Sequence, residues 1–329
     1  MLAARLEAVG TVRTVEIAVP EPGPGEVLVR VEAAGICGTD RHLFHGEFPC
    51  RPPVTLGHEF SGIVVGRGAG VDLDEGVRVT CDPNDWCGVC GPCLRGRVNL
   101  CERNVATGIH RDGGFAEYAV FPARKAVLLP AELDPHHGAF CEPLACTLHG
   151  MDLGAPAPGE RVLVLGGGVI GLLAVQLARL AGAEVMLLTR HPAKRALAER
   201  LGAGASAGSP EEALALWPEG ADLVLECAGV AETVAGAGRL ARAGGRIVVL
   251  GVLPKGERVA IEPFDLLFRE IQMHFAFINP FTQARAAALI ASGAVAVAPL
   301  ISRVVPLAEA PEAIANPARP GDVKVLVKP

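Results

Sequence analysis

The stretch Val162–Gly182, VLVLGGGVIGLLAVQLARLAG, decides the fold of this chain. Four apolar residues precede glycines in a G-x-G-x-x-G pattern, and an apolar-periodic run follows them, which predicts a strand, a tight turn and a helix. The first glycine allows the sharp turn, the second lets the backbone approach a pyrophosphate, and the third lets the helix pack close to its strand. A structural turn in a glycine-rich chain is the alternative, and the flanking strand and helix favour a dinucleotide site, with the pyrophosphate at the helix N-terminus. The turn residues assigned to the cofactor are Gly166, Gly168, Val169, Ile170 and Gly171.

The residues at the end of the next predicted strand indicate which dinucleotide binds. An NAD site normally places an acidic residue about 20 residues after the glycines, where it binds the ribose hydroxyls. Here Thr189 occupies that place, Arg190 follows it, and Lys194 and Arg195 lie shortly after. A hydroxyl and cationic side chains favour a 2′-phosphate that a carboxylate would repel, so we predict NADP ahead of NAD. Alternatively, Arg190 stacks on the adenine, and Lys194 and Arg195 lie on an exposed helix face.

Further apolar runs alternate with helical patterns beyond this turn, including VMLL, DLVLE and RIVVLG. Strands that are apolar on both faces and separated by helices predict a buried parallel sheet of the doubly wound α/β class. In such sheets, ligands bind beyond the carboxyl ends of the strands. We therefore add Cys227, Gly251 and Val252 to the predicted cofactor site.

Composition limits the remaining possibilities. The 329 residues are half hydrophobic and 20% charged, which suffices for two domains with separate cores. The formal net charge of −6 is mild and shows no basic stripe, so nothing indicates nucleic acid or an anionic membrane as a partner. With no signal peptide evident, we expect a cytoplasmic protein whose ten cysteines serve as metal ligands and free thiols.

Four of the cysteines form the pattern C-x2-C-x2-C-x7-C, at Cys87, Cys90, Cys93 and Cys101, in a loop with Gly and Pro turns. Four thiolates form a closed tetrahedral zinc site, which leaves no position open for substrate. An iron–sulfur cluster prefers other spacings, and a disulfide knot is disfavoured in the cytoplasm. We therefore predict a structural zinc.

A second group of metal-ligand types precedes this loop: Cys37 in GICGTDRH, and His58 with Glu59 in GHEFSG. Thiolate, imidazole and carboxylate are all zinc ligands. Their separation along the chain does not show that they meet, and singly each has an ordinary structural interpretation. Together with the four-cysteine loop, they favour a second zinc site.

These motifs in this order, GICGTDRH, GHEFSG, the four cysteines and GGGVIG, resemble the zinc-containing medium-chain alcohol dehydrogenase family over nearly the whole chain. The resemblance implies a mainly β, GroES-like catalytic domain beside the Rossmann cofactor domain. The segment FCEPLACTLHG around Glu142 resembles the sorbitol (polyol) dehydrogenase branch. The neighbouring threonine dehydrogenases usually have aspartate there, and share the DGGFAEY found at residues 112–118.

The resemblance implies roles for individual residues. Cys37, His58 and Glu59 would hold a catalytic zinc, which lowers the pKa of a bound hydroxyl, and Glu142 would be a fourth ligand or a partner of the zinc-bound water. Thr39 would hydrogen-bond the substrate hydroxyl, and His42 would pass its proton to solvent through the cofactor ribose. The resemblance also implies a homotetramer.

The predicted domains are 1–148 (catalytic, with the zinc lobe at about 85–103), 149–279 (dinucleotide-binding) and 280–329 (return to the catalytic domain). An arginine that many polyol dehydrogenases carry just after the cofactor domain is absent from Phe275–Asn279, which argues against sorbitol itself. We predict a zinc-dependent, NADP-preferring dehydrogenase of small secondary alcohols such as polyols. The alternatives are an enzyme resembling L-threonine 3-dehydrogenase, and a zinc-structured dinucleotide-binding protein without turnover.

Overall fold

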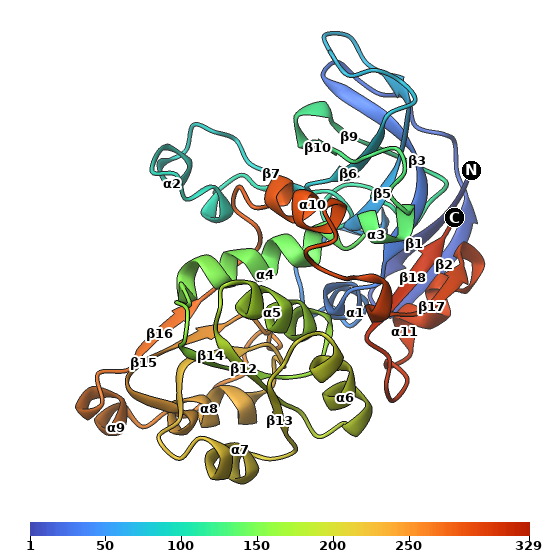
Figure 1. Cartoon of the computed structure of the whole chain (residues 1–329). Helices are drawn as coiled ribbons and strands as arrows, with labels where there is room; N and C mark the ends of the chain where they lie inside the picture. The colour runs from blue at the N-terminus through green and yellow to red at the C-terminus, as the bar shows by residue number, and fades with distance from the viewer. The chain divides into compact units, whose positions relative to one another are not determined.

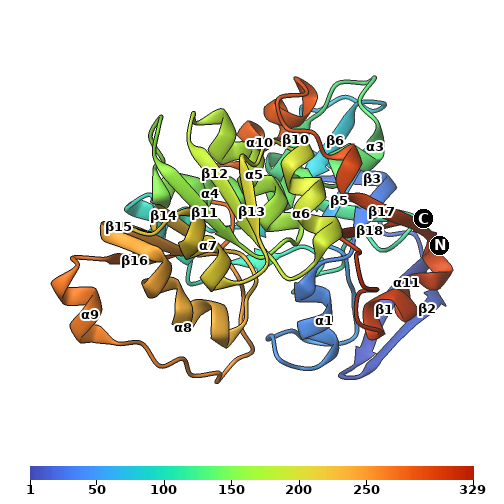
Figure 2. The same ribbon diagram turned by 60° about the horizontal axis from the view of Figure 1, so that its bottom comes forward.

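The computed structural model describes residues 1–329, which divide into two compact units (Figures 1 and 2). Unit 1 comprises Met1–Pro143, Asn279–Gly293 and Ile301–Pro329, and unit 2 comprises Leu144–Ile278 and Ala294–Leu300. The chain thus leaves unit 1 and returns to it. None of the helices combines the length and the apolar character that crossing a bilayer requires.

Unit 1 is mainly β. Its strands are β1 (Leu2–Ala8), β2 (Thr11–Glu16), β3 (Glu26–Gly35), β4 (Val54–Thr55), β5 (Glu59–Arg67), β6 (Arg78–Cys81), β7 (Asn84–Asp85), β8 (Val105–Ala106), β9 (Tyr118–Pro122), β10 (Ala126–Leu128), β17 (Ile301–Pro306) and β18 (Lys324–Lys328). The largest sheet has the order β10-β6-β5-β3-β18-β17, with β9 also paired to β3. Alternating apolar positions predicted the first strands, and the inward-facing side chains of β3 (Val27, Val29, Val31) do lie in the buried core. The final strand β18 pairs with β3, so both ends of the chain contribute to this unit.

Short helices complete unit 1: α1 (Gly38–Phe44), α2 (Gly91–Leu94), α3 (Pro135–Gly138), α10 (Gln283–Ala291) and α11 (Ala310–Ala315). Helix α4 (Cys141–Gly154) begins in unit 1 and continues into unit 2. Helices α3 and α4 are separate, with Ala139 at the C-terminal cap of α3.

Unit 2 is the predicted doubly wound fold. Its strands are β11 (Arg161–Leu165), β12 (Glu184–Leu188), β13 (Ala205–Ala207), β14 (Ala221–Glu226), β15 (Ala241–Val249) and β16 (Gln272–Phe275), and its helices are α5 (Val169–Leu180), α6 (Pro192–Arg200), α7 (Pro210–Leu216), α8 (Ala231–Leu240) and α9 (Pro263–Phe268). All neighbouring strands are parallel, in the order β13-β12-β11-β14-β15-β16. The central strands are buried on both faces, with α5 and α8 on opposite sides of the sheet (Figure 1). The α/β class is therefore confirmed.

One segment differs from the predicted domain assignment. The sequence assigned all of 280–329 to the catalytic domain, whereas Ala294–Leu300 belongs to unit 2. The reason is the buried amide of Gln176 on α5, whose Nε2 donates to the carbonyl of Ala296 at 3.0 Å and whose Oε1 accepts from the Ala296 N–H at 2.8 Å. Val295, Val297 and Leu300 are also buried. A polar residue on the apolar face of a helix was the only sequence signal of this contact.

Candidate active site and cofactor site

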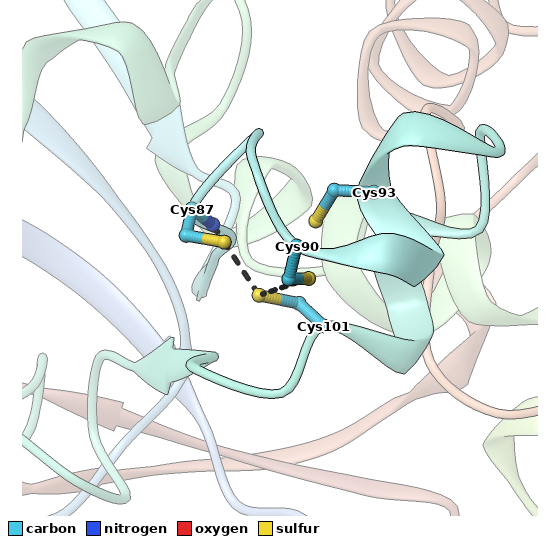
Figure 3. Close-up of side chains that lie close together, drawn as sticks. All are labelled: Cys87, Cys90, Cys93 and Cys101. Atoms are coloured by element: carbon cyan, nitrogen blue, oxygen red, sulfur yellow. Dashed lines mark hydrogen bonds between the residues drawn. The ribbon is translucent and has the colours of Figure 1, made fainter.

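The four-cysteine lobe brings its sulfur atoms together (Figure 3). The Sγ atoms of Cys87, Cys90, Cys93 and Cys101 all lie within 4.8 Å of one another. Backbone N–H groups support this arrangement, because the N–H of Cys87 lies 3.3 Å, and that of Arg103 3.4 Å, from the Sγ of Cys101. Four converging sulfurs with backbone donors form the geometry that a tetrahedral metal ion requires.

The protonation of these thiols also suits a metal site. The N–H of Val89 lowers the pKa of Cys87 to about 6, and backbone N–H donors led by Cys93 lower the pKa of Cys90 despite partial desolvation. Desolvation and the neighbouring thiols raise the pKa of Cys93 to about 12. Thiolates therefore form readily within the cluster, but their mutual repulsion limits how many are charged together. A bound cation removes that limit.

The second predicted cluster is also assembled. Cys37 precedes helix α1 as its N-terminal cap, His58 immediately precedes β5, and Glu59 is the first residue of β5. Their ligand atoms lie within 4.8 Å of one another. Glu142, buried in the first turn of α4, is not among the three residues of this group. The sequence left open which of Glu59 and Glu142 binds zinc directly, and the geometry places Glu59 within this group.

A lysine that the sequence analysis did not single out contacts this cluster. Lys324, the first residue of β18, is 2% exposed, and its Nζ forms an ion pair with Oε2 of Glu59, which is 1% exposed. Strand β3 lies between β5 and β18 in the sheet, and the ion pair passes over its last residue, Gly35. A Cβ on Gly35 would overlap Glu59 Oε2 and lie 2.6 Å from Lys324 Cε. Glycine is therefore needed at position 35.

Asp40 is the other buried charge beside the cluster. One of its oxygens accepts the N–H of Cys37 at 2.8 Å, and the other lies 3.6 Å from Nδ1 of His58. Burial alone would lower the pKa of His58, but the Cys37 thiolate and the Asp40 carboxylate outweigh burial and raise that pKa well above its ordinary value. With Nδ1 facing Asp40, the other ring nitrogen is left for a metal ion, as is usual for ligating histidines.

The charges of this site fit a divalent cation. The site gathers three acidic groups, Cys37, Asp40 and Glu59, around one lysine, Lys324, and one histidine, His58. Buried charge is costly unless it is neutralised. A divalent cation would offset this surplus of acidic groups, and the donor atoms are those zinc prefers. The residues present therefore fit a zinc ion.

Helix α1 carries both residues of the predicted proton path. Thr39 Oγ1 lies 3.7 Å from Cys37 Sγ, next to the metal-ligand cluster. His42, half-buried one helical turn later, binds Glu47 Oε2 through Nδ1 at 2.6 Å. This contact leaves its Nε2 available to exchange a proton with another partner.

In unit 2, the glycine turn has the predicted strand–turn–helix form between β11 and α5. Gly166 adopts a φ of +104°, which favours glycine, and a Cβ on Gly171 would overlap the carbonyl oxygen of Gly166. Gly168 caps α5, and a Cβ there would meet open space. The N-terminus of a 12-residue helix is therefore accessible to a phosphate.

The residues predicted to select the cofactor lie at the end of β12. Thr189 is buried, whereas Arg190 is exposed. A Cβ on Gly167 would lie 3.0 Å from Lys194 Cβ and 3.2 Å from Thr189 Cγ2, so both side chains lie against the glycine turn. Arg195 has a different role, because its Nη1 donates to the carbonyl of Thr189 at 3.0 Å. This hydrogen bond stabilises the loop that follows β12.

The other predicted cofactor residues lie at the ends of β14 and β15. The N–H of Cys227 donates to the carbonyl of Leu165 at the end of β11, and the N–H of Gly251 donates to the carbonyl of Glu226. Val252 is more than half exposed. Burial, and then the neighbouring Glu226 carboxylate, raise the pKa of Cys227 well above its ordinary value, so this residue remains a neutral thiol.

Comparison with known proteins identifies the family of this chain. The alcohol dehydrogenase GroES-like domain family matches residues 23–131, and the zinc-binding dehydrogenase family matches residues 169–292. The 2-dehydro-3-deoxy-L-galactonate 5-dehydrogenase of Pseudoalteromonas atlantica is 35% identical over 93% of this chain and 92% of its own length. The chain belongs to the zinc-containing medium-chain alcohol dehydrogenase family.

Other relatives place this dehydrogenase within the family. D-arabinitol dehydrogenase 1 of Uromyces fabae is 34% identical, covering 92% of this chain and 90% of its own. The L-threonine 3-dehydrogenase of Thermococcus kodakarensis is 33% identical, covering 79% and 77%. A crystal structure of a zinc-binding dehydrogenase from Sinorhizobium meliloti 1021, bound to NADP, is 58% identical with a TM-score of 0.97 and covers 100% of this chain and 99% of its own. The protein is therefore an oxidoreductase that uses a nicotinamide dinucleotide, and its resemblance to the polyol branch is confirmed.

Proposed function

We propose that this protein is a zinc-dependent dehydrogenase that oxidises a secondary hydroxyl of a polyol or a related sugar acid with NADP in preference to NAD. The assembled Cys37–His58–Glu59 cluster is the observation that carries the proposal, because a zinc site with three protein ligands leaves a coordination position for the substrate. The polyol and sugar-acid dehydrogenases among its relatives support the substrate class.

In this proposal, Cys37 and His58 hold the catalytic zinc, and Glu59 is the third ligand through the carboxylate oxygen that Lys324 does not occupy. Bound zinc supplies Lewis acidity that favours loss of the hydroxyl proton near neutral pH. The hydroxyl of Thr39 accepts a hydrogen bond from the substrate hydroxyl. His42, oriented by Glu47, passes the proton toward solvent. A bound nicotinamide dinucleotide would supply the hydride acceptor for the carbon that bears the hydroxyl.

The four-cysteine lobe holds a second, structural zinc. Its four sulfurs complete a tetrahedral site without any other ligand, so it has no position for a substrate. Two ions per chain are therefore expected, one in each cluster.

The preference for NADP rests on the end of β12. Thr189 replaces the acidic residue typical of NAD sites, and the cationic Arg190 and Lys194 lie next in sequence, with Lys194 against the glycine turn. These groups favour a 2′-phosphate. The Sinorhizobium meliloti relative, bound to NADP, supports this assignment.

The test is the initial rate with NADP and with NAD over polyols, sugar acids, simple secondary alcohols and threonine. We expect turnover on hydroxylated sugars that favours NADP and is lost with a chelator. Arg190→Ala should lower kcat/KM with NADP by about 10- to 100-fold, because it removes a charged phosphate contact of about 1.5–3 kcal/mol. The matched variant Thr189→Asp should shift the preference to NAD. An unchanged cofactor ratio in both variants would refute the NADP assignment.

An enzyme resembling L-threonine 3-dehydrogenase is the second candidate, which the Thermococcus kodakarensis relative favours. Glu142, where the threonine dehydrogenases usually carry aspartate, argues against it. Oxidation of threonine alone in the substrate panel would establish this alternative. A binding protein without turnover is disfavoured, because three candidate ligands of the catalytic zinc meet in one cluster.

We further propose that the enzyme is a cytoplasmic homotetramer. The ten cysteines are not paired in disulfides, as expected in a reducing compartment. Strand β16 is an edge of the unit 2 sheet, and its Phe275 is 67% exposed, which suits burial against another subunit. Light scattering that gives the mass of a monomer would refute the tetramer.

A further inference from the structure

Glu226 is a completely buried carboxylate with no role in the function described so far. It ends β14, between β11 and β15 in the unit 2 sheet, and its side chain is 0% exposed. Burying a carboxylate is expensive unless donors surround it. Such a residue at the carboxyl end of a central strand therefore requires an explanation.

One oxygen of Glu226 holds the loop that follows β14. Its Oε1 accepts the N–H groups of Ala228 at 2.8 Å and Gly229 at 2.9 Å, and the hydroxyl of Thr233 at 2.7 Å. All three donors are neutral. The carboxylate therefore fixes the backbone between β14 and α8.

The same residue also holds the loop after β15. Its carbonyl accepts the N–H groups of Leu250 at 2.8 Å and Gly251 at 3.0 Å. Its Oε2 has no hydrogen-bond partner and lies 2.5 Å from where a Cβ of residue 251 would stand. A Cβ on Gly229 would in turn lie 2.8 Å from the carbonyl oxygen of Val252. The two loops are in close contact, so the loop that the Glu226 side chain holds packs directly against the loop that its main-chain carbonyl binds.

The position of these loops indicates their ligand. The strand order runs outward from β11 in both directions, and the crevice beyond the carboxyl ends of such strands receives the dinucleotide. In the proposed cofactor site, Thr189 and Arg190 at the end of β12 are assigned to the adenosine half, and the N-terminus of α5 to the pyrophosphate. The nicotinamide half therefore extends to the opposite side, over the ends of β14 and β15.

We propose that the side chain of Glu226 is a positioning group that orders the loop 227–230, and through its packing the loop 250–252, and thereby places the nicotinamide half of the cofactor. The inference rests on the proposed dehydrogenase function. Glu226 acts through the loop backbone and does not itself touch the cofactor. Its substitution should therefore affect the nicotinamide half and leave the adenosine half bound as before.

The test compares the binding of NADPH with that of 2′,5′-ADP, a probe of the adenosine half alone, to the zinc-loaded enzyme. Glu226→Ala should weaken NADPH binding and lower kcat, each by about 10- to 100-fold, because a displaced nicotinamide is poorly aligned for hydride transfer. Its affinity for 2′,5′-ADP should stay within about twofold of the wild type, since the contacts of the adenosine half are untouched. Glu226→Gln, which retains an acceptor for the three donors, should restore most of both losses.

Arg190→Ala is the matched control and should give the opposite pattern, with the two ligands weakened alike. If Glu226→Ala does not fold, Thr233→Val removes one of the three donors from a partly exposed position and should give the same selectivity at a smaller amplitude. Equal weakening of NADPH and 2′,5′-ADP, or no weakening of either, would overturn the proposal. Failure of the wild-type enzyme to bind either nicotinamide cofactor would instead refute the proposed function.

Discussion

The two metal-ligand clusters of unit 1 use similar donor atoms but are built in opposite ways. The lobe takes its four ligands from the single stretch 87–101, and nearby backbone N–H groups support their sulfurs. The Cys37–His58–Glu59 cluster takes its ligands from the ends of separate elements, and a lysine from the last strand of the chain supports it. One cluster is local in sequence, whereas the other requires the folded sheet.

Because the two clusters are built differently, we expect the metal to contribute differently to the stability of each. Between its cysteines the lobe buries little apolar surface, chiefly Val98 beside Cys90 and Cys93, so the metal supplies most of what orders it. The other cluster lies at the edge of a large core, and the Glu59–Lys324 ion pair links two strands of its sheet. We therefore expect the lobe to depend on metal for its structure, and the other cluster to depend on metal for its chemistry.

The largest predicted effect is the loss of catalysis in Cys37→Ala. Removing a thiolate ligand should empty the catalytic site and lower kcat/KM by about 10³-fold or more, since zinc contributes several kcal/mol of transition-state stabilisation. Metal analysis should then give one zinc per chain instead of two, and a nearly unchanged melting temperature. Wild-type activity in a variant that has lost this zinc would show that catalysis resides elsewhere.

Lys324→Met should have the next largest effect, and mainly on stability. It leaves the Glu59 carboxylate buried without its cation, which costs about 3–5 kcal/mol in comparable buried pairs. Urea unfolding of the variant measures the loss. The double variant Lys324→Met/Glu59→Gln is the control and should recover much of the stability, because it leaves no uncompensated charge. If the single and double variants are equally unstable, the ion pair is not the cause.

Cys90→Ala in the lobe should have a smaller and local effect. Loss of a ligand should release the lobe zinc and open residues 87–101, while the sheet of unit 1 remains folded. Limited proteolysis should then cut within this stretch at least about tenfold faster than in the wild type, and activity measured before cleavage should fall much less than in Cys37→Ala. Global unfolding of Cys90→Ala would show that the lobe is not a local unit.

The lobe and the dinucleotide turn were predictable from sequence because each is encoded by spacing over a short stretch. The local geometry of each follows directly from the spacing of its motif, which is G-x-G-x-x-G between a strand and a helix for the turn and C-x2-C-x2-C-x7-C for the lobe. The meeting of Cys37 with His58 and Glu59 was predicted only through a family resemblance. Nothing in their spacing fixes the sheet order that brings β3 and β5 together.

Lys324 and Glu226 were missed for a related reason. Each is a charged residue at the end of an apolar strand, in KVLVK and ADLVLE, where such a residue usually lies at the surface. Burial of both follows from strand pairing between distant segments, which periodicity does not specify. The same argument applies to Gln176, whose partner is Ala296, far along the chain.

The smallest predicted effect concerns a region of unit 2 that is held by charge and contains no metal-ligand cluster. Arg246 lies 2.6 Å from Glu160 and also binds the carbonyl of Ala155, and its hydrogen bonds lower the pKa of Glu160. A lowered folded-state pKa contributes stability that is present above the unfolded value of about 4.3 and is lost as pH falls through the folded value. Glu160→Gln should therefore be less stable than the wild type at pH 7, by about 1 kcal/mol or less, and the difference should shrink as pH falls below about 4.3. Urea midpoints at a series of pH values, with and without chelator, measure this difference. A difference that changes with chelator would show that this region depends on metal, contrary to the contrast with the lobe.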